Sequence, residues 1–381
     1  MCRRPISRKR ACSSAFAPVR YRARPKPNPC VTPLKAVIRV VSLSVNPPLA
    51  VILGVSGPAL SPREVAFFRE IDPFGFILFG RNVESPDQVR ALTEALRACV
   101  GRDDAPILID QEGGRVQRLG PPHWRKIPPA EDFGALYGRD REAGVEAARL
   151  NARLIAHELR GLGIDTDCLP VLDVRQSAAD DIVGDRAYSD DPGVVAALGA
   201  AVAQGLLAGG VFPVIKHIPG HGRAHADSHL RLPVVDNPLA ELDASDFLPF
   251  KALADAPFAM TAHILYTAID AGAPATLSAE VVSQVIRGVC GFTGLLMTDD
   301  LSMKALEGPM EDRTRRSFAA GCDLVLHCNG DRVEMDGVAR AARAMDLAGL
   351  ARWQGAKERL GHPTADYDAG ADLARLLELM G

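Results

Sequence analysis

Short apolar runs that alternate with longer amphipathic stretches restrict the fold of this chain more than any other feature of its sequence. Such alternation predicts βα units and a parallel sheet. The runs FGFILF and APILI are apolar without interruption, as is typical of strands buried on both faces. Strands are predicted at eight places, which are residues 50–55, 75–79, 106–110, 165–173, 212–217, 258–263, 294–298 and 323–327.

The stretches between these runs predict helices. Residues 144–161 repeat leucine and isoleucine at offsets of four or five residues, which places them on one face of a helix. Ser61 stands before Pro62 and three residues before Glu64, the pattern of an N-cap with a capping box. Ser278 is predicted to cap the helix before the seventh strand.

Eight βα repeats predict an α/β fold of the TIM type, a single-domain (β/α)8 barrel. A doubly wound sheet is the alternative, and it usually has fewer strands and a G-x-G-x-x-G turn after the first strand. Here the first strand is followed by GVSGPALSP, which lacks that spacing. We therefore predict a catalytic barrel at residues 49–350 and a C-terminal helical tail at residues 351–381 that packs on it.

Charge is distributed unevenly along the 381 residues. Eleven of the 44 Lys and Arg lie in residues 1–48, which hold no Asp or Glu, so the rest of the chain carries 33 basic and 47 acidic residues. An acidic body of this kind argues against nucleic-acid binding, because phosphate repels it. The basic leader lacks the apolar stretch of a secretory signal, and we predict a disordered extension. A transit-like peptide and a start codon placed too far upstream are the alternatives.

The eight cysteines are scattered, and no C-x-x-C pair suggests a zinc site or a disulfide framework. Reduced thiols are typical of a cytoplasmic protein. No apolar run approaches the roughly 20 residues that a membrane span needs. We expect a cytoplasmic monomer that has neither a membrane nor a nucleic acid as its partner.

Ionisable residues stand at the ends of six of the predicted strands. They are Asp110, Asp173, Lys216 with His217, His263, Asp299 with Asp300, and His327. Charged groups at the end of an apolar strand are costly unless they serve a purpose. The C-terminal ends of barrel strands meet at one face, where barrel enzymes build their active sites. We therefore predict that these side chains gather in one site.

The segment KHIPGHGRAHADSH, residues 216–229, has a histidine at every fourth position. On a helix these histidines would share one face and could bind zinc. Its proline and two glycines disfavour a helix, so a strand end followed by a long loop fits better and we expect no metal. Within the loop, Asp227 lies two residues before His229, and such a carboxylate–imidazole pair could act as a general acid/base.

The loop K-H-I-P-G-H-G-(x)4-D-S-H closely resembles the signature of bacterial β-N-acetylhexosaminidases of glycoside hydrolase family 3. The loop motif is highly specific, whereas DQEGGR-type blocks are shared more widely across family 3. The blocks together extend from about Leu49 to Asn329. Further blocks that resemble those of the family, in its order, are ILFGRN at 77–82, DQEGGRVQR at 110–118, PVLDV at 170–174, GDR at 184–186, MTAH at 260–263, PATLS at 274–278 and TDDLSM at 298–303.

The resemblance implies a retaining exo-β-N-acetylglucosaminidase without a cofactor. Its implied substrate is a peptidoglycan fragment of the N-acetylglucosamine-anhydromuramyl-peptide type, which places the enzyme in muropeptide recycling. Asp299 matches the catalytic nucleophile, His229 the general acid/base and Asp227 the partner of that histidine. The residues that match sugar-binding positions are Asp110, Arg118, Arg186, Lys216 and His217. Both arginines could instead be structural ion-pair partners.

The remaining polar residues of these blocks have less definite roles. Asp300 matches no catalytic role, and Asp173 and His263 are expected to support other side chains. His221, His225 and His327 stay unassigned. The natural substrates of the family carry an anionic muramic acid on the leaving side. We hypothesise that an imidazole paired with a carboxylate repels this acid less than a second carboxylate would.

Several alternatives stay open. A family 3 β-glucosidase typically takes its acid/base Glu from a second domain, for which the chain leaves no room. Transfer to phosphate would make the protein a phosphorylase, and a metal-dependent barrel enzyme would be sensitive to chelators. A non-catalytic sugar-binding barrel would keep Arg118 and Lys216 but would not need Asp299.

Overall fold

The structure is a computed structural model that describes residues 46–176, 183–224, 228, 231–361 and 367–381. The leader that was predicted to be disordered lies almost wholly outside these residues, and so do Asp227 and His229. Residues from Pro47 to Gly381 form one structural unit.

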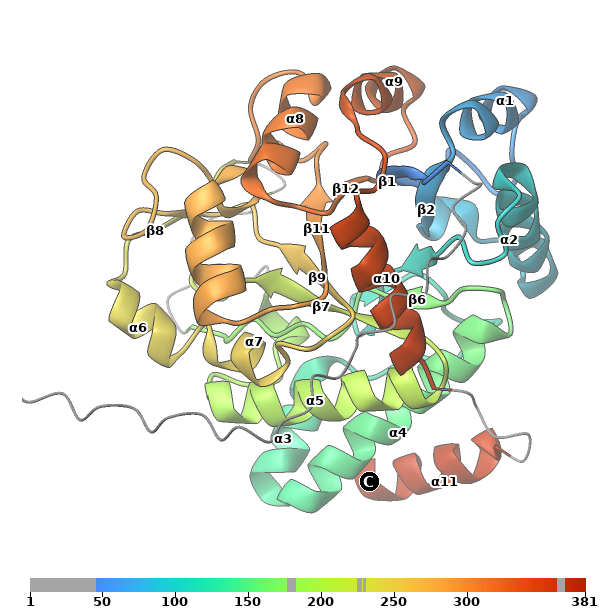
Figure 1. Cartoon of the computed structure of the whole chain (residues 1–381). Helices are drawn as coiled ribbons and strands as arrows, with labels where there is room; N and C mark the ends of the chain where they lie inside the picture. The colour runs from blue at the N-terminus through green and yellow to red at the C-terminus, as the bar shows by residue number, and fades with distance from the viewer. Residues whose placement is uncertain (1–45, 177–182, 225–227, 229–230, 362–366) are drawn as a thin grey trace, which may run out of the picture. The chain divides into compact units, whose positions relative to one another are not determined.

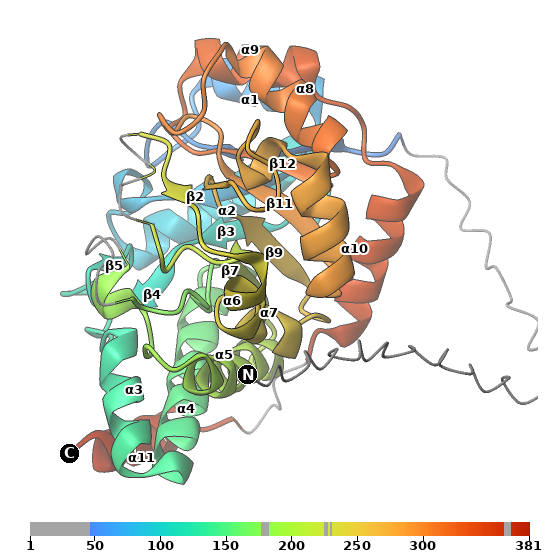
Figure 2. The ribbon, with the colours of Figure 1, turned by 90° about the vertical axis from the view of Figure 1, so that its left-hand side faces the viewer.

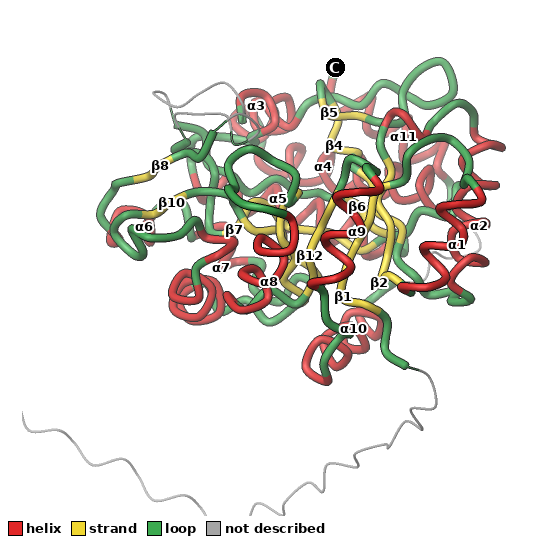
Figure 3. The backbone as a smooth tube through the Cα atoms, turned by 90° about the horizontal axis from the view of Figure 1, so that it is seen from above, coloured by secondary structure: helices red, strands yellow, loops and turns green. Residues whose placement is uncertain are grey.

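Eight parallel strands close into a barrel, which confirms the predicted fold (Figure 1). Around the barrel their order is β1-β12-β11-β9-β7-β6-β3-β2. Seen from above, the strands form the centre and helices surround them (Figure 3). The strands are β1 (Leu49–Gly54), β2 (Pro73–Leu78), β3 (Ile107–Ile109), β6 (Thr166–Asp167), β7 (Phe212–Ile218), β9 (Phe258–Thr261), β11 (Leu295–Asp300) and β12 (Leu324–His327). The short strands outside the barrel are β4 (Gln111–Gly113), β5 (Val116–Gln117), β8 (Val234–Val235) and β10 (Leu265–Tyr266).

Strand β6 is shorter than the predicted strand at 165–173. Regular pairing ends at Asp167, and in the segment that follows, Pro170 has no N–H group to donate to a neighbouring strand. Its carbonyl oxygen still accepts a hydrogen bond from the Lys216 N–H at 3.1 Å, and Val214 donates to Leu169 O at 3.1 Å. The segment therefore continues the wall of the barrel as an irregular strand beside β7.

Several helices begin where the sequence supplies a capping side chain. Ser61 and Glu64 form the predicted capping box of α1, and the Ser278 hydroxyl accepts a hydrogen bond from Val281 N at 3.1 Å. Helix α4 begins at Arg141, three residues before the predicted start, because Asp140 caps it. The α-helices are α1 (Pro62–Ile71), α2 (Pro86–Val100), α3 (Ala130–Arg139), α4 (Arg141–Arg160), α5 (Pro192–Ala208), α6 (Leu239–Ala244), α7 (Leu248–Ala252), α8 (Met310–Ala320), α9 (Arg332–Ala341), α10 (Leu347–Arg359) and α11 (Ala369–Met380). The 3-10 helices are η1 (Gly80–Asn82), η2 (Gly184–Arg186) and η3 (Ala275–Leu277), and η4 (Val281–Val289) is a π-helix.

Alternate residues of each strand pack into two separate cores. In β1, Ala50 and Ile52 belong to the cluster inside the barrel, whereas Val51 and Leu53 pack with the surrounding helices. This follows from the period of two in a strand, which sends successive side chains to opposite faces. Burying one such aliphatic side chain contributes roughly 1.5–3 kcal/mol. The continuous apolar runs in the sequence therefore reflect burial on both faces.

Trp353 of α10 fills the amino-terminal end of the barrel. Its ring centroid lies 5.2 Å from that of Phe74, 5.2 Å from that of Phe212 and 5.9 Å from that of Phe258. Helix α10 begins before residue 350, so it crosses the predicted boundary between barrel and tail. Helix α11 lies against α4, where Arg375 pairs with Glu146 (Figure 2). Within the described ranges, no helix is long and apolar enough to span a membrane.

Candidate active site

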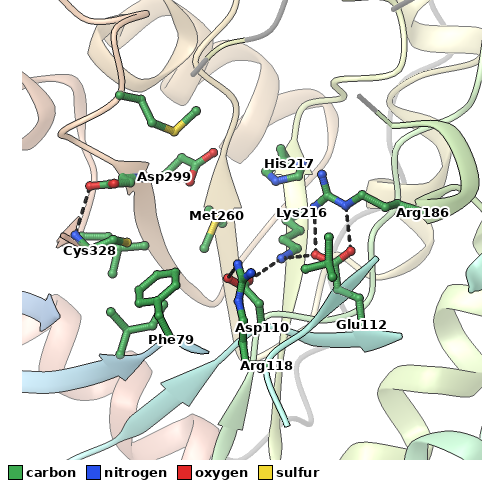
Figure 4. Close-up of a pocket in the computed structure, with 15 residues that line it drawn as sticks. Phe79, Asp110, Glu112, Arg118, Arg186, Lys216, His217, Met260, Asp299 and Cys328 are labelled. Atoms are coloured by element: carbon green, nitrogen blue, oxygen red, sulfur yellow. Dashed lines mark hydrogen bonds and ion pairs between the residues drawn. The ribbon is translucent and has the colours of Figure 1, made fainter. Parts of the chain in front are cut away.

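A pocket of about 170 Å³ opens at the C-terminal ends of the barrel strands. Its wall combines charged groups with a few apolar side chains, among them Phe79 and Met260 (Figure 4). The ionisable lining residues are Asp110, Glu112, Arg118, Arg186, Lys216, His217, Asp299, Asp300 and Cys328. This is the face on which barrel enzymes carry their catalytic groups.

The structure brings six of the sequence-predicted site residues into this pocket. They are Asp110, Arg118, Arg186, Lys216, His217 and Asp299. They come from segments far apart in the chain, and Asp110 and Lys216 are 106 positions apart. Asp227 and His229 lie outside the described residues. Pocket residues for which the sequence analysis proposed no role include Glu112, Phe79 and Met260.

A tight hairpin places Asp110, Glu112 and Arg118 side by side. Strand β4 pairs antiparallel with β5 directly after the end of β3. Gly113 adopts a φ of +102°, and a Cβ atom there would lie 2.3 Å from the carbonyl oxygen of Pro128. The position therefore requires glycine on two grounds, conformation and space. The hairpin folds the charged DQEGGRVQR block back over the mouth of the barrel.

Lys216 is the centre of a buried ion-pair network. Its ammonium nitrogen lies 2.8 Å from Asp110 Oδ1 and 2.7 Å from Glu112 Oε1. Arg118 donates to the other oxygen of Asp110 at 3.0 Å, and Arg186 donates two hydrogen bonds of 2.8 Å to Glu112. The side chain of Lys216 is only 2% exposed. Each buried charge thus has a partner of opposite sign, which buried charges require.

These contacts fix the charge states of the network. Burial raises the pKa of Asp110, but the charges of Lys216 and Arg118 outweigh burial and hold that pKa below its usual value. Burial lowers the pKa of Lys216, whereas Asp110 and Glu112 raise it more, so the ammonium stays protonated. The pocket therefore presents fixed charges and N–H donors to a polar ligand.

His217 is oriented by Asp173 beneath it. The ring atom Nδ1 lies 2.7 Å from Asp173 Oδ2, and the backbone N–H groups of His217 and His221 donate to Asp173 Oδ1 at 3.1 and 2.7 Å. Burial raises the pKa of Asp173, but His217 and His221 lower it further, to about 2. The ionised carboxylate holds the proton of His217 on Nδ1, which leaves Nε2 as the ring atom available to a ligand. Lys216 and His217 are joined by a cis peptide bond.

The two neighbouring aspartates of β11 have different surroundings. The Asp300 carboxylate accepts hydrogen bonds from the N–H groups of Ser302 at 3.0 Å and Cys328 at 3.1 Å, and from the Ser302 hydroxyl at 2.6 Å. The Asp299 carboxylate accepts one from the N–H of Asp300 at 2.8 Å. Burial raises the pKa of Asp299, while His217 and His263 lower it more. Asp299 is thus an ionised carboxylate in the pocket, whereas the Asp300 carboxylate binds Ser302 and Cys328 in the segments that follow β11 and β12.

Two further histidines support this arrangement from the core. His263 lies 2.7 Å from the Thr276 hydroxyl through Nδ1 and 3.0 Å from the carbonyl oxygen of Asp300 through Nε2. His221 lies 3.3 Å from the Ser228 hydroxyl through Nε2. Burial lowers the pKa of both rings, and that of His221 to about 4. Both are therefore neutral hydrogen-bonding groups near pH 7.

Glu112 is the charged pocket residue with the most contacts to the predicted site residues for which the sequence suggested no role. One signal could have indicated it: Glu112 stands two positions after Asp110, and alternate residues of an extended segment point to the same side. Over the described part of the chain, no group of three or more His, Cys, Asp or Glu side chains could hold a metal ion.

Comparisons with protein families, with curated proteins and with solved structures all indicate similarity to glycoside hydrolase family 3. The family model described as the glycosyl hydrolase family 3 N-terminal domain matches residues 71–359. A β-hexosaminidase of Xylella fastidiosa is 38% identical over 338 residues, which cover 87% of this chain and 98% of that protein. The crystal structure of NagZ from Neisseria gonorrhoeae in complex with N-trifluoroacetyl-D-glucosamine aligns with a TM-score of 0.79 at 32% identity. That alignment covers 88% of this chain and 99% of the NagZ chain. NagZ from the same organism in complex with a zinc ion aligns with a TM-score of 0.78 at 30% identity, and again 88% of this chain and 99% of that chain are covered.

Proposed function

The chain belongs to glycoside hydrolase family 3 and is a β-hexosaminidase, and from this premise we propose which residues hydrolyse its substrate and which sugar they hold. In the proposal, Asp299 is the nucleophile of a retaining mechanism, and His229 is the acid/base with Asp227 as its partner. The terminal N-acetylglucosamine is held by Asp110, Arg118, Arg186, Lys216 and His217.

The different surroundings of the two aspartates carry this proposal. A nucleophilic carboxylate must be ionised and free to approach the anomeric carbon of the sugar. Asp299 meets both conditions, because it lines the pocket and its pKa lies below the usual value. Asp300 is engaged by Ser302 and Cys328 through both of its oxygens. Asp299 is therefore the better candidate for the nucleophile.

The proposed reaction has two steps that conserve atoms and charge. First, Asp299 attacks the anomeric carbon, the bond to the leaving oxygen breaks, and the protonated His229 gives its proton to that oxygen. In the second step, the neutral imidazole takes a proton from water as the water oxygen attacks the same carbon. The ester bond to Asp299 breaks, and the sugar leaves with its configuration retained.

Ser228 supports the assignment of the acid/base. It is the residue between Asp227 and His229, and only 3% of its surface is exposed. Its hydroxyl lies 3.3 Å from His221 Nε2, and its carbonyl oxygen accepts a hydrogen bond from Ala305 N at 3.1 Å. Ala305 follows β11, the strand of Asp299. Ser228 is thus anchored near the strand that carries the proposed nucleophile.

The natural substrate is proposed to be a peptidoglycan fragment with N-acetylglucosamine at its non-reducing end and anhydromuramyl-peptide as the leaving group. The gonococcal NagZ complex supports a pocket for an N-acylglucosamine, since its ligand is N-trifluoroacetyl-D-glucosamine. A cytoplasmic location fits the five described cysteines, which are all free thiols. The predicted monomeric state is checked by light scattering of the full chain.

The test is the release of nitrophenol from p-nitrophenyl β-N-acetylglucosaminide. We expect wild-type activity and a loss of at least about 1000-fold in kcat for Asp299→Asn, because a nucleophile is replaced. Asp300→Asn serves as the matched control, since its amide oxygen can still accept from Ser302 and Cys328, and should lose less than about tenfold. An inactive wild type, or an active Asp299→Asn variant, contradicts the proposal.

Two additions to this assay separate the alternatives. Phosphate in the buffer distinguishes hydrolysis from phosphorolysis, because only a phosphorylase yields a sugar phosphate. Incubation with a chelator distinguishes a metal-dependent enzyme, and we expect the activity to survive it.

A further inference from the structure

Glu112 binds two of the three cations in the pocket at once. Its Oε1 contacts both Lys216 at 2.7 Å and Arg186 at 2.8 Å, while its Oε2 accepts from Arg186 Nε at 2.8 Å. The Glu112 side chain is 4% exposed, and those of Arg186 and Lys216 are 15% and 2% exposed. Figure 4 shows the carboxylate between the two cationic groups. No step of the proposed reaction uses this carboxylate.

We infer that Glu112 is a positioning residue, which fixes the guanidinium of Arg186 and the ammonium of Lys216 in the geometry that binds the sugar. This inference rests on the proposed function, because it assumes that the two cations hold the substrate. Glu112, the third residue of the DQEGGR block, would thus hold both cations at once, which neither Arg186 nor Lys216 can do for the other.

The donors that remain free after these contacts explain how the positioning works. Lys216 donates a hydrogen bond to Asp110 and forms an ion pair with Glu112, so with respect to the described residues its ammonium keeps at least one N–H donor for a ligand. Arg186 uses its Nε–H and one Nη–H on Glu112, and no other described residue takes its remaining N–H groups. A forked pairing fixes the plane of the guanidinium, so the free donors have one direction. Glu112 thus converts two long, flexible side chains into fixed donors.

A purely structural ion pair elsewhere in the chain provides the contrast. Glu158 of α4 accepts a hydrogen bond from Arg125 at 2.8 Å, and both side chains are largely buried, at 19% and 16% exposed. Neither residue lines the pocket. Removing the charge of Glu158 therefore perturbs a comparable pair without touching the sugar site, which makes Glu158→Gln the matched control.

The experiment measures KM and kcat on p-nitrophenyl β-N-acetylglucosaminide, and Ki for N-acetylglucosamine. In Glu112→Gln, the single amide oxygen cannot serve both cations, and the amide N–H₂ faces a positive charge. We expect KM and Ki to rise by about tenfold or more, from lost charged hydrogen bonds, and kcat to fall less than KM rises. Glu158→Gln should leave KM within about twofold of wild type. A KM for Glu112→Gln within twofold of wild type, or an equal rise in Glu158→Gln, overturns the inference.

A double-mutant cycle tests whether Glu112 acts through Arg186. In an Arg186→Met background, adding Glu112→Gln should raise KM by a smaller factor than it does in wild type, because one of the positioned cations is already absent. Equal factors in the two backgrounds contradict positioning of Arg186.

A second variant keeps the inference testable if Glu112→Gln does not fold. Glu112→Asp retains the charge but withdraws the carboxylate by one methylene, so it cannot reach both cations. Its KM should also rise, and an unchanged KM overturns the inference. An inactive wild type would instead refute the proposed function, so the two failures are distinguishable.

Discussion

The Asp173 carboxylate binds His217 twice, through the ring atom Nδ1 at 2.7 Å and the backbone N–H at 3.1 Å. Both oxygens are used, and Asp173 is completely buried. The carboxylate therefore sets the tautomer of the ring as well as its orientation, so that Nε2 of His217 is left available to a ligand in the pocket.

Asp173→Asn should lower kcat/KM by about tenfold to hundredfold. The asparagine can turn its N–H₂ group toward Nδ1, which places the imidazole proton on Nε2 and reverses the hydrogen bond offered to the sugar. Steady-state kinetics on the nitrophenyl substrate measure the effect. Asp323→Asn is a suitable control, because Asp323 is a buried partner of Arg287 and Arg352 outside the pocket. Equal losses in both variants would contradict a specific role for Asp173.

Stability should fall in weak acid because of His221. Burial lowers the pKa of this ring to about 4, while the unfolded chain has a histidine pKa of about 6.5. Between these values the unfolded state binds a proton that the folded state does not, so the free energy of unfolding decreases as pH falls through this window. The contribution is on the order of 3 kcal/mol.

Urea unfolding at pH 7 and pH 4.5, for wild type and His221→Gln, measures this dependence. The variant should lose less stability between the two pH values than wild type, because glutamine does not titrate. An identical decrease in both proteins would show that His221 does not cause it.

His229→Glu tests the electrostatic explanation for a histidine acid/base. A glutamate would repel the carboxylate of a muramic acid leaving group, so the variant should lose preference for anionic over neutral leaving groups. The ratio of kcat/KM for the two substrate types is the measurement. If the variant favours anionic leaving groups as strongly as wild type, the explanation is wrong.

Trp353→Ala should destabilise the protein by about 3–5 kcal/mol without changing KM. The substitution leaves a cavity among Phe74, Phe212 and Phe258 at the end of the barrel remote from the charged pocket. Thermal unfolding measures the loss, and kinetics below the transition check KM. A marked rise in KM would show that packing at the amino-terminal end of the barrel affects the pocket at its opposite end, contrary to this prediction.

The barrel could be predicted because each strand is indicated by a short run of neighbouring residues in the sequence. Most of the strands are apolar runs of a few residues, and their burial on two faces leaves few polar interruptions before their C-terminal ends. The predicted length of β6 was wrong because regular pairing ends at Asp167, and beyond it the segment with Pro170 pairs with β7 only through isolated hydrogen bonds. Helix caps such as Ser61 were also predictable, since the residues that form them are three positions apart.

The ion pairs of the pocket could not be predicted in the same way. Glu112 and Arg186 are 74 positions apart, and no period in the sequence relates them. The resemblance to the family indicated Arg186 and Lys216 but not the carboxylate that joins them. Such a contact depends on how hairpin β4–β5 folds over the barrel, which is a property of tertiary structure.

The aromatic closure by Trp353 also has a kinetic consequence. Because this end of the barrel is filled, a ligand in the pocket at the C-terminal ends of β3, β7 and β11 cannot leave through the barrel and has to depart on the side from which it entered. Together with the proposed two-step reaction, this predicts a fixed order of release, with the leaving group first, water arriving in the vacated space, and the sugar last. We therefore expect an enzyme that removes one residue per encounter and releases the shortened chain before it can cut again.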